Sequence, residues 1–313
     1  MKRMCKWILS AACLFGLQGL SAQTIELGTY QGSGCTGKAK LVTHEAWLGR
    51  KVDVILDGPS QASWTAAVDT TRWLTNCWKG QDKKLVMYMP MVLNDGTSSL
   101  DLGAKGSYDQ YIRQIGEILV ANGFANTIVR IGPEFNAPWF RWSATKDPVT
   151  WRLYWRRIVE VLRQVPNSNF RFDWNPIVGA GAASPEAAYP GDDVVDYIGA
   201  DVYNGNWAPQ LTPLQRWQVL MTAPFGLEWH RKFAAAHGKP MTFPEWGTGT
   251  RPDGHGGGDD PVFMQKMADW IKSNPVKYHI YWDYPASDYN GSISNGSQPA
   301  AAAIFLKEFG VVK

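Results

Sequence analysis

Eight short runs of apolar and β-branched residues, separated by longer segments of helical periodicity, limit the folds open to this chain. Several runs are continuously apolar rather than alternating, as expected for parallel strands buried on both faces. Eight strand–helix units in roughly 290 residues is the number and size typical of a (β/α)8 TIM barrel, an α/β fold that we predict as a single domain. A doubly wound sheet is the alternative, but no glycine-rich phosphate loop follows an early strand.

The boundaries of the expected elements follow the apolar pattern. The expected strands are 25–30, 51–57, 84–91, 126–134, 170–175, 195–204, 241–246 and 277–284. The clearest expected helices are 108–121, 149–164, 215–236 and 261–273. Because barrel active sites lie at the C-terminal ends of the strands, the residues that close each strand are the candidates for function.

The first residues have the pattern of a secretory signal peptide. Lys2, Arg3 and Lys6 precede an apolar run over residues 7–20. The small residues Ser21 and Ala22 follow this run, and we expect cleavage after Ala22. We therefore expect a protein that is secreted or periplasmic, with the signal in residues 1–22.

The remaining chain, 23–313, is close to neutral. Removal of the signal takes away three of the 31 basic residues and none of the 28 acidic ones, so the net charge falls from +3 to zero. This balance argues against a nucleic-acid partner and against a polybasic membrane surface. No later apolar run approaches the roughly 18 residues that span a bilayer, so we expect no membrane insertion after removal of the signal. Separately, we expect the protein to be a monomer.

Two cysteines, Cys35 and Cys77, follow the signal. In an oxidising compartment they could form one disulfide. Two unpaired buried thiols are the equal alternative, since neither cysteine has the spacing of a metal or redox motif.

Two glutamates close predicted strands that should lie nearly opposite each other. Glu134 ends the strand 126–134 and Glu245 lies near the end of 241–246, so both carboxyls are expected at one mouth of the barrel. Glycoside hydrolysis requires such a pair, with one carboxyl protonating the leaving oxygen while the other attacks or stabilises the sugar. Ordinary surface or ion-paired acids are the alternative, but both glutamates stand among aromatic residues, where an unpaired carboxylate would be costly.

Aromatic residues at strand ends are the second indication of a sugar site. Trp139, Trp142, Trp246 and Trp282 fall at or just after predicted strand ends, where flat rings could bind the C–H faces of sugars. The alternative is that tryptophan fills the core, which we expect of those in predicted helices. At the end of the strand 195–204, Tyr203 could hydrogen-bond the carboxylate of the seventh strand.

Other polar residues on these strands have two interpretations. Arg130 lies four residues before Glu134, so strand alternation puts both on one face, where Arg130 could pair with a site carboxylate or form a structural ion pair. We interpret Asp173 and Asp201 as structural acids bonded to loop amides. The glycine-rich segment 254–260 is interpreted as a flexible loop near the site; we expect neither a metal nor a cofactor.

These segments resemble glycoside hydrolase family 26, a family of retaining (β/α)8 enzymes that includes β-mannanases and some β-glucanases. Four segments carry the resemblance: 27–30, 130–142, 195–203 and 238–247. It implies that Glu134 is the acid/base and Glu245 the nucleophile, that Tyr203 contacts the nucleophile, and that Trp282 lies beside the cleaved sugar. In the acid/base segment the resemblance also covers Asn136, the second residue after that glutamate.

One residue departs from the family pattern, because Pro133 stands where better-known members have histidine before the acid/base. The resemblance implies a retaining endo-β-glycosidase, and the departure at Pro133 leaves its polysaccharide open between a β-mannan, a β-glucan and a bacterial exopolysaccharide. A catalytically silent polysaccharide-binding barrel is the alternative, and a metal-dependent hydrolase, for which no ligand cluster is evident, is the third.

Overall fold

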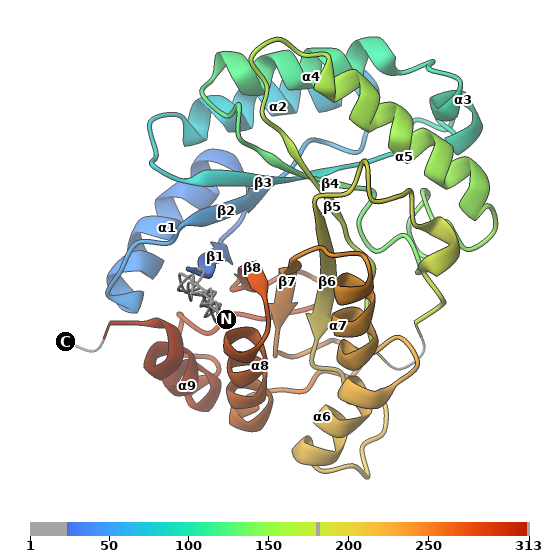
Figure 1. The fold of residues 1–313 in the computed structure, drawn as a ribbon. Helices are drawn as coiled ribbons and strands as arrows, with labels where there is room; N and C mark the ends of the chain where they lie inside the picture. The colour runs from blue at the N-terminus through green and yellow to red at the C-terminus, as the bar shows by residue number, and fades with distance from the viewer. Residues whose placement is uncertain (1–23, 180–181, 312–313) are drawn as a thin grey trace, which may run out of the picture.

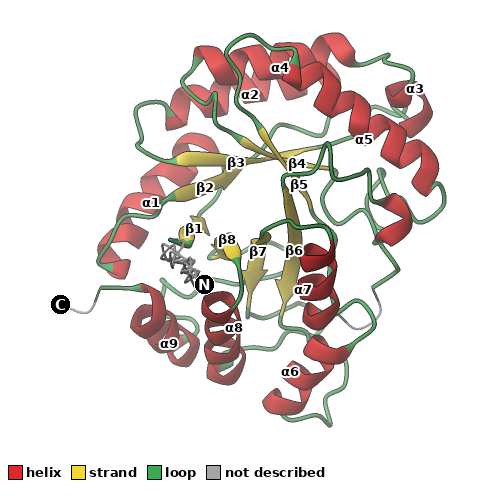
Figure 2. Cartoon of the chain, viewed as in Figure 1, coloured by secondary structure: helices red, strands yellow, loops and turns green. Residues whose placement is uncertain are grey.

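The computed structural model describes residues 24–179 and 182–311, and it confirms the predicted barrel. Eight parallel strands pair in chain order, and the last closes on the first, with the helices around the outside (Figures 1 and 2). The strands are β1 (Glu26–Tyr30), β2 (Val54–Asp57), β3 (Lys84–Met89), β4 (Ile128–Ile131), β5 (Arg171–Trp174), β6 (Tyr197–Tyr203), β7 (Met241–Gly247) and β8 (Val276–Trp282).

The helical layer differs from the expectation in two places. The helices are α1 (Gly34–Leu48), α2 (Trp64–Trp78), α3 (Leu100–Ala104), α4 (Asp109–Ala121), α5 (Pro148–Arg163), α6 (Pro213–Thr222), α7 (Leu227–Ala236), α8 (Pro261–Ser273) and α9 (Pro299–Phe309). The single helix expected over 215–236 is wrong: a turn containing Pro224 and Gly226 separates α6 from α7, since proline lacks the N–H that a continuous helix needs. Between β5 and β6 the described residues form the one-turn 3₁₀ helix η1 (Glu186–Ala188) in place of an α-helix.

The barrel interior changes from apolar to charged along the strands. An apolar cluster fills part of the interior, formed by Val54, Leu56, Val86, Ile128, Tyr278 and Ile280. Farther along the strands, Arg130 of β4 lies in register with Asp173 of β5, and Asp201 of β6 with Glu245 of β7. A larger apolar core packs the strands against the helices. Polar side chains thus enter the barrel where sequence reasoning placed the site.

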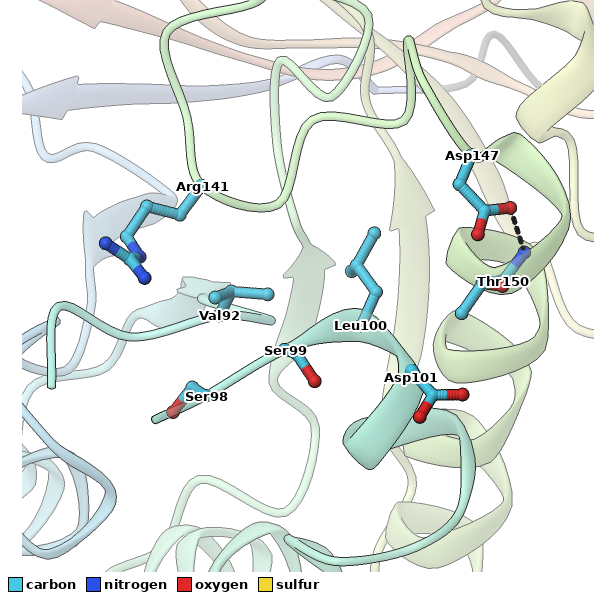
Figure 3. Close-up of a pocket in the computed structure, with 8 residues that line it drawn as sticks. All are labelled: Val92, Ser98, Ser99, Leu100, Asp101, Arg141, Asp147 and Thr150. Carbon is cyan, nitrogen blue, oxygen red and sulfur yellow. Dashed lines mark hydrogen bonds between the residues drawn. The ribbon is translucent and has the colours of Figure 1, made fainter. Parts of the chain in front are cut away.

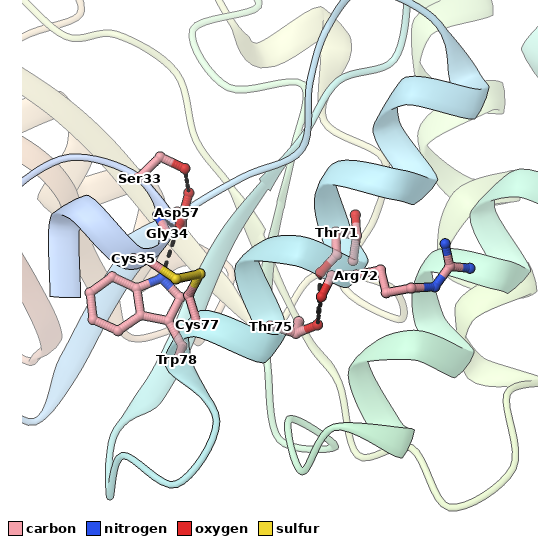
Figure 4. The surroundings of a disulfide bond; sticks show 9 residues. All are labelled: Ser33, Gly34, Cys35, Asp57, Thr71, Arg72, Thr75, Cys77 and Trp78. Atoms are coloured by element: carbon pink, nitrogen blue, oxygen red, sulfur yellow. Dashed lines mark hydrogen bonds between the residues drawn. A yellow bond between two sulfur atoms is a disulfide. The ribbon is translucent and has the colours of Figure 1, made fainter.

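A disulfide joins Cys35 of α1 to Cys77 of α2, which settles the question that the sequence left open (Figure 4). The Cα atoms are 4.8 Å apart and 42 residues separate the cysteines in sequence. In the chain-entropy model, closing a loop of this length stabilises the fold by about 4 kcal/mol.

The predicted signal segment 1–22 lies outside the described residues. Within the described ranges, none of the helices has the length and apolar character needed to cross a bilayer.

Candidate active site

Glu134 and Glu245 lie together at the C-terminal mouth of the barrel. One carboxylate oxygen of each, and one of Asp201, lie within 4.8 Å of one another. Glu245 belongs to β7, whereas Glu134 follows the end of β4 by three residues. The two glutamates are partly exposed and Asp201 is buried, so two carboxyls face the solvent side of the site and the third supports them from below.

Arg130 is the fully buried centre of the polar network below these carboxyls. Its Nη1 donates to Glu245 Oε1 at 2.7 Å, its Nη2 to Asp201 Oδ2 at 2.7 Å, and its Nε to Asn175 Oδ1 at 2.7 Å. Burial alone would lower the pKa of Arg130, but the charges of Asp201 and Glu245 raise it above its usual value. The guanidinium therefore holds a fixed positive charge between two acids.

Both oxygens of Glu245 accept a hydrogen bond. Arg130 donates to Oε1, and the hydroxyl of Tyr203 donates to Oε2 at 2.8 Å. Burial and the charge of Glu245 raise the pKa of Tyr203 well above its usual value, so this hydroxyl keeps its proton. Two donors, one from β4 and one from β6, thus fix the orientation of the carboxylate, and the contact expected of Tyr203 is present.

Glu134 has a different environment, which favours its protonated form. Burial, and secondly the charge of Glu245, raise the pKa of Glu134 to about 7, although a hydrogen bond from Trp139 Nε1 to Oε2 at 3.0 Å opposes this shift. The backbone of Glu134 is left-handed, with φ of 55°, and its N–H donates to the Asn175 carbonyl at 2.8 Å. One carboxyl is therefore poised to give up a proton near neutral pH while its neighbour is held by two donors.

Two of the predicted aromatic residues lie where a sugar could reach them. Trp282, at the end of β8, stacks on Tyr30 of β1 with ring centroids 4.3 Å apart, and its ring meets Tyr203 edge-on at 6.3 Å. Trp139 is 60% exposed and hydrogen-bonded to Glu134. One ring therefore lies against Glu134 and the other beside Tyr203, which holds Glu245.

Three other residues predicted to bind substrate are buried in structural positions. Trp142 is 1% exposed and donates to the Pro133 carbonyl. Trp246 is fully buried and points outward among the helices, because strand alternation turns it away from the interior that Glu245 faces. The Asn136 side chain hydrogen-bonds to the backbone of another loop, donating to the Ile177 and Ala183 carbonyls and accepting from the Ile177 N–H. The structure therefore places Trp142, Trp246 and Asn136 in structural contacts rather than on the exposed surface expected of residues that bind a sugar.

The two interior aspartates are buried, as expected, but side chains rather than loop amides bind them. Asp201 pairs with Arg130, while Asp173 accepts from Thr242 Oγ1 and the Tyr278 hydroxyl, each at 2.6 Å. Sequence reasoning also missed Asn175, which holds both the Arg130 side chain and the Glu134 backbone. Its alternation with Asp173 could have indicated that it shares the interior face.

The three clustered acids are also the group of the described residues with the spacing of metal ligands. Two of them, Asp201 and Glu245, already give an oxygen to the buried arginine, whose charge compensates theirs. In the glycine-rich loop after β7, Asp259 caps α9 and Asp260 caps α8 through their side chains, so both carboxylates have structural partners.

A pocket of about 440 Å³ lies between the segments that follow β3 and β4 (Figure 3). It is lined by Val92, Ser98, Ser99, Leu100, Asp101, Arg141, Asp147 and Thr150. Asp147 caps α5 through the Thr150 N–H, and Asp101 pairs with Lys105, so two of the charged groups in this pocket have structural partners. Neither Glu134 nor Glu245 lines it.

Comparisons with known proteins agree with this geometry. The model of glycosyl hydrolase family 26 matches residues 63–227, more than half of the chain. A modular endo-β-1,4-mannanase from Cellulomonas fimi is similar in structure, with a TM-score of 0.66, 19% identity, and coverage of 92% of this chain and 70% of that one. A family 26 β-mannanase from Bacteroides ovatus has a TM-score of 0.64 and 17% identity, with coverage of 91% of this chain and 88% of that one. The YdhT protein of Bacillus subtilis has a TM-score of 0.63 and 14% identity, with coverage of 92% of this chain and 87% of that one. At these identities the structural likeness supports the fold, and no curated protein sequence matches the chain. The match to the family model shows that the chain belongs to glycosyl hydrolase family 26, and it is a glycoside hydrolase, an enzyme that acts on O-glycosyl bonds.

Proposed function

We propose that the protein is a secreted, monomeric, retaining endo-β-glycosidase that cleaves a β-mannan, a β-glucan or a bacterial exopolysaccharide. The separation of the two glutamates carries this proposal. Retaining glycosidases hold their carboxyls about 5–5.5 Å apart, whereas inverting enzymes need about 6.5–9.5 Å to admit a water molecule between them. Oxygens of Glu134 and Glu245 lie within 4.8 Å, which supports retention.

The reaction follows from the different environments of the two carboxyls. Glu134 gives its proton to the glycosidic oxygen while Glu245 attacks the anomeric carbon, so the C–O bond to the leaving sugar breaks and a glycosyl ester of Glu245 forms. Glu134, now a carboxylate, takes a proton from water. The water oxygen attacks the same carbon, releases Glu245 and leaves a sugar of unchanged anomeric configuration.

Neighbouring residues position these groups and the sugar. Arg130 and Tyr203 aim the Glu245 carboxylate at the anomeric carbon and compensate its charge. Trp282, braced by Tyr30, offers a flat face to the sugar that is cleaved. Trp139 lies against the acid, next to the sugar that leaves.

Export of the protein is supported by two features. The first 22 residues have the pattern of a signal peptide, and Cys35 and Cys77 form a disulfide. Disulfides form and persist in oxidising compartments outside the cytosol.

Reducing-end release from a panel of polysaccharides tests the function. The chain from residue 23 is incubated with β-mannans, β-glucans, xylans and bacterial exopolysaccharides, and Glu245→Gln serves as the matched control on each polymer. We expect cleavage of one polymer class by the unaltered protein and none by the variant. Binding without cleavage would instead favour the silent polysaccharide-binding barrel.

The pH dependence of kcat/KM should report the acid. Because Glu134 must carry a proton and its pKa is about 7, kcat/KM should fall as the pH rises through 7. The hydrogen bond from Trp139 lowers this pKa, so Trp139→Phe should move the alkaline limb to higher pH. Initial rates at low substrate concentration across pH 5–9 give the alkaline limb of kcat/KM for the unaltered protein and for Trp139→Phe. A limb that stays in place or moves to lower pH in the variant would contradict the assignment of Glu134 as the acid.

A further inference from the structure

The rim of the barrel mouth carries a second exposed tryptophan, which sequence reasoning did not select. Trp207 is 63% exposed and follows β6 in the connection to α6. It stands four residues after Tyr203, and four residues span at most about 14 Å. The ring therefore lies on the same face of the barrel as the Glu245 carboxylate that Tyr203 contacts.

Side chains from the next connection support this ring. His255 stacks on Trp207 with centroids 4.3 Å apart and planes 22° from parallel, and the Arg251 guanidinium lies 5.4 Å from the ring centre. Arg251 is itself held by Asp253 at 2.9 Å. An exposed indole with an imidazole and a paired guanidinium packed against it is more rigid than a lone surface tryptophan.

Backbone contacts join the two connections that carry these side chains. Gly205 forms an antiparallel bridge with Gly256, and the Asn206 N–H donates to the His255 carbonyl at 2.8 Å. The Gly205 backbone also lies against the indole, since a Cβ there would stand 2.7 Å from Trp207 Nε1. Binding would therefore cost little ordering of the loops, which is the condition for a preformed subsite.

The chemistry of this surface fits a sugar ring better than a protein partner. It offers a 63% exposed indole flanked by charged hydrogen-bonding groups, Arg251 and Asp253, which match the C–H groups and the hydroxyls of a pyranose. It stands on the rim of a site whose substrate is a chain of such rings. We infer that Trp207, braced by His255 and Arg251, is the platform of an additional subsite that binds a pyranose ring of the polysaccharide away from the bond being cleaved. This inference rests on the proposed function for its ligand class.

Affinity electrophoresis in gels containing glucomannan, barley β-glucan, β-1,3-xylan or xanthan tests the platform without hydrolysis. The Glu245→Gln protein is compared with the same protein carrying Trp207→Ala, Trp207→Phe or Trp73→Ala. Trp73 is the matched control because it is an exposed tryptophan of the outer helix α2. We expect one polymer to retard the parent, Trp207→Ala to weaken that binding about tenfold, Trp207→Phe to retain most of it and Trp73→Ala to leave it unchanged.

A kinetic measurement separates a subsite from a general loss of structure. In the active protein, Trp207→Ala should raise KM for the polymer that is cleaved and leave kcat within about twofold, because the platform contacts neither Glu134 nor Glu245. Unchanged affinity in Trp207→Ala, or retardation of the parent by none of the four polymers, would overturn the inference. If a polymer retards the parent and Trp207→Ala abolishes this retardation, but the unaltered protein cleaves none of the polymers, the platform is supported and the proposed hydrolysis is refuted.

Discussion

Replacement of Glu245 by glutamine should lower kcat by about 10⁴-fold or more while the protein remains folded. The amide is nearly the size of the carboxylate, and its oxygen can still accept the Arg130 hydrogen bond, but it cannot attack the anomeric carbon. Reducing-end release, with thermal unfolding as the control for folding, measures the effect. Activity within tenfold of the unaltered protein would remove Glu245 from the nucleophile role.

The same variant has a second readout that does not need turnover. The charge of Glu245 helps to raise the pKa of Glu134, so its removal should lower that pKa. The indole of Trp139 donates to Glu134 and should report its protonation through fluorescence. A titration midpoint near pH 7 in the unaltered protein and a lower one in Glu245→Gln would link the two carboxyls. An unmoved midpoint would contradict that link.

Replacement of Arg130 by methionine should be the most destabilising single change in the site. It leaves the buried carboxylate of Asp201 without its charged partner and removes a donor from Glu245, and breaking a buried pair in this way costs about 3–5 kcal/mol. Urea unfolding at neutral pH measures the loss of unfolding free energy.

A double variant distinguishes charge imbalance from loss of packing. If Asp201→Asn is added to Arg130→Met, the uncompensated buried charge disappears, and we expect part of the lost stability to return. No recovery in the double variant, or a loss below about 1 kcal/mol in the single one, would show that Arg130 does not act as the compensating charge.

The fold was predictable because its signal is local. Each expected strand overlaps an observed one, since continuous apolar runs specify strands buried on both faces. The helix expected over 215–236 failed at Pro224, where the local stop signal was present but outweighed by the apolar pattern on both sides. The boundary that Asp260 and the following proline set for α8 matched the expectation.

The site was predictable only in part, because its contacts cross the barrel. Glu134 and Glu245 follow from the positions of strand ends, but Arg130 meets partners 45, 71 and 115 residues away, and only the register of the barrel decides which. Trp246 shows what strand alternation could have corrected, because a residue next to an inward Glu245 must point outward. No local rule could have shown that Asn136 would turn to the backbone of another loop.

The left-handed backbone of Glu134 has a consequence for engineering. A non-glycine residue in this conformation costs about 1–2 kcal/mol, and burial of its carboxyl adds a further cost once the proton is lost. Considered for folding alone, glycine would suit position 134 better than glutamate. A programme that improves heat resistance in this barrel therefore needs an activity screen beside it, because thermal selection by itself favours loss of the residue that we propose as the acid of the hydrolysis.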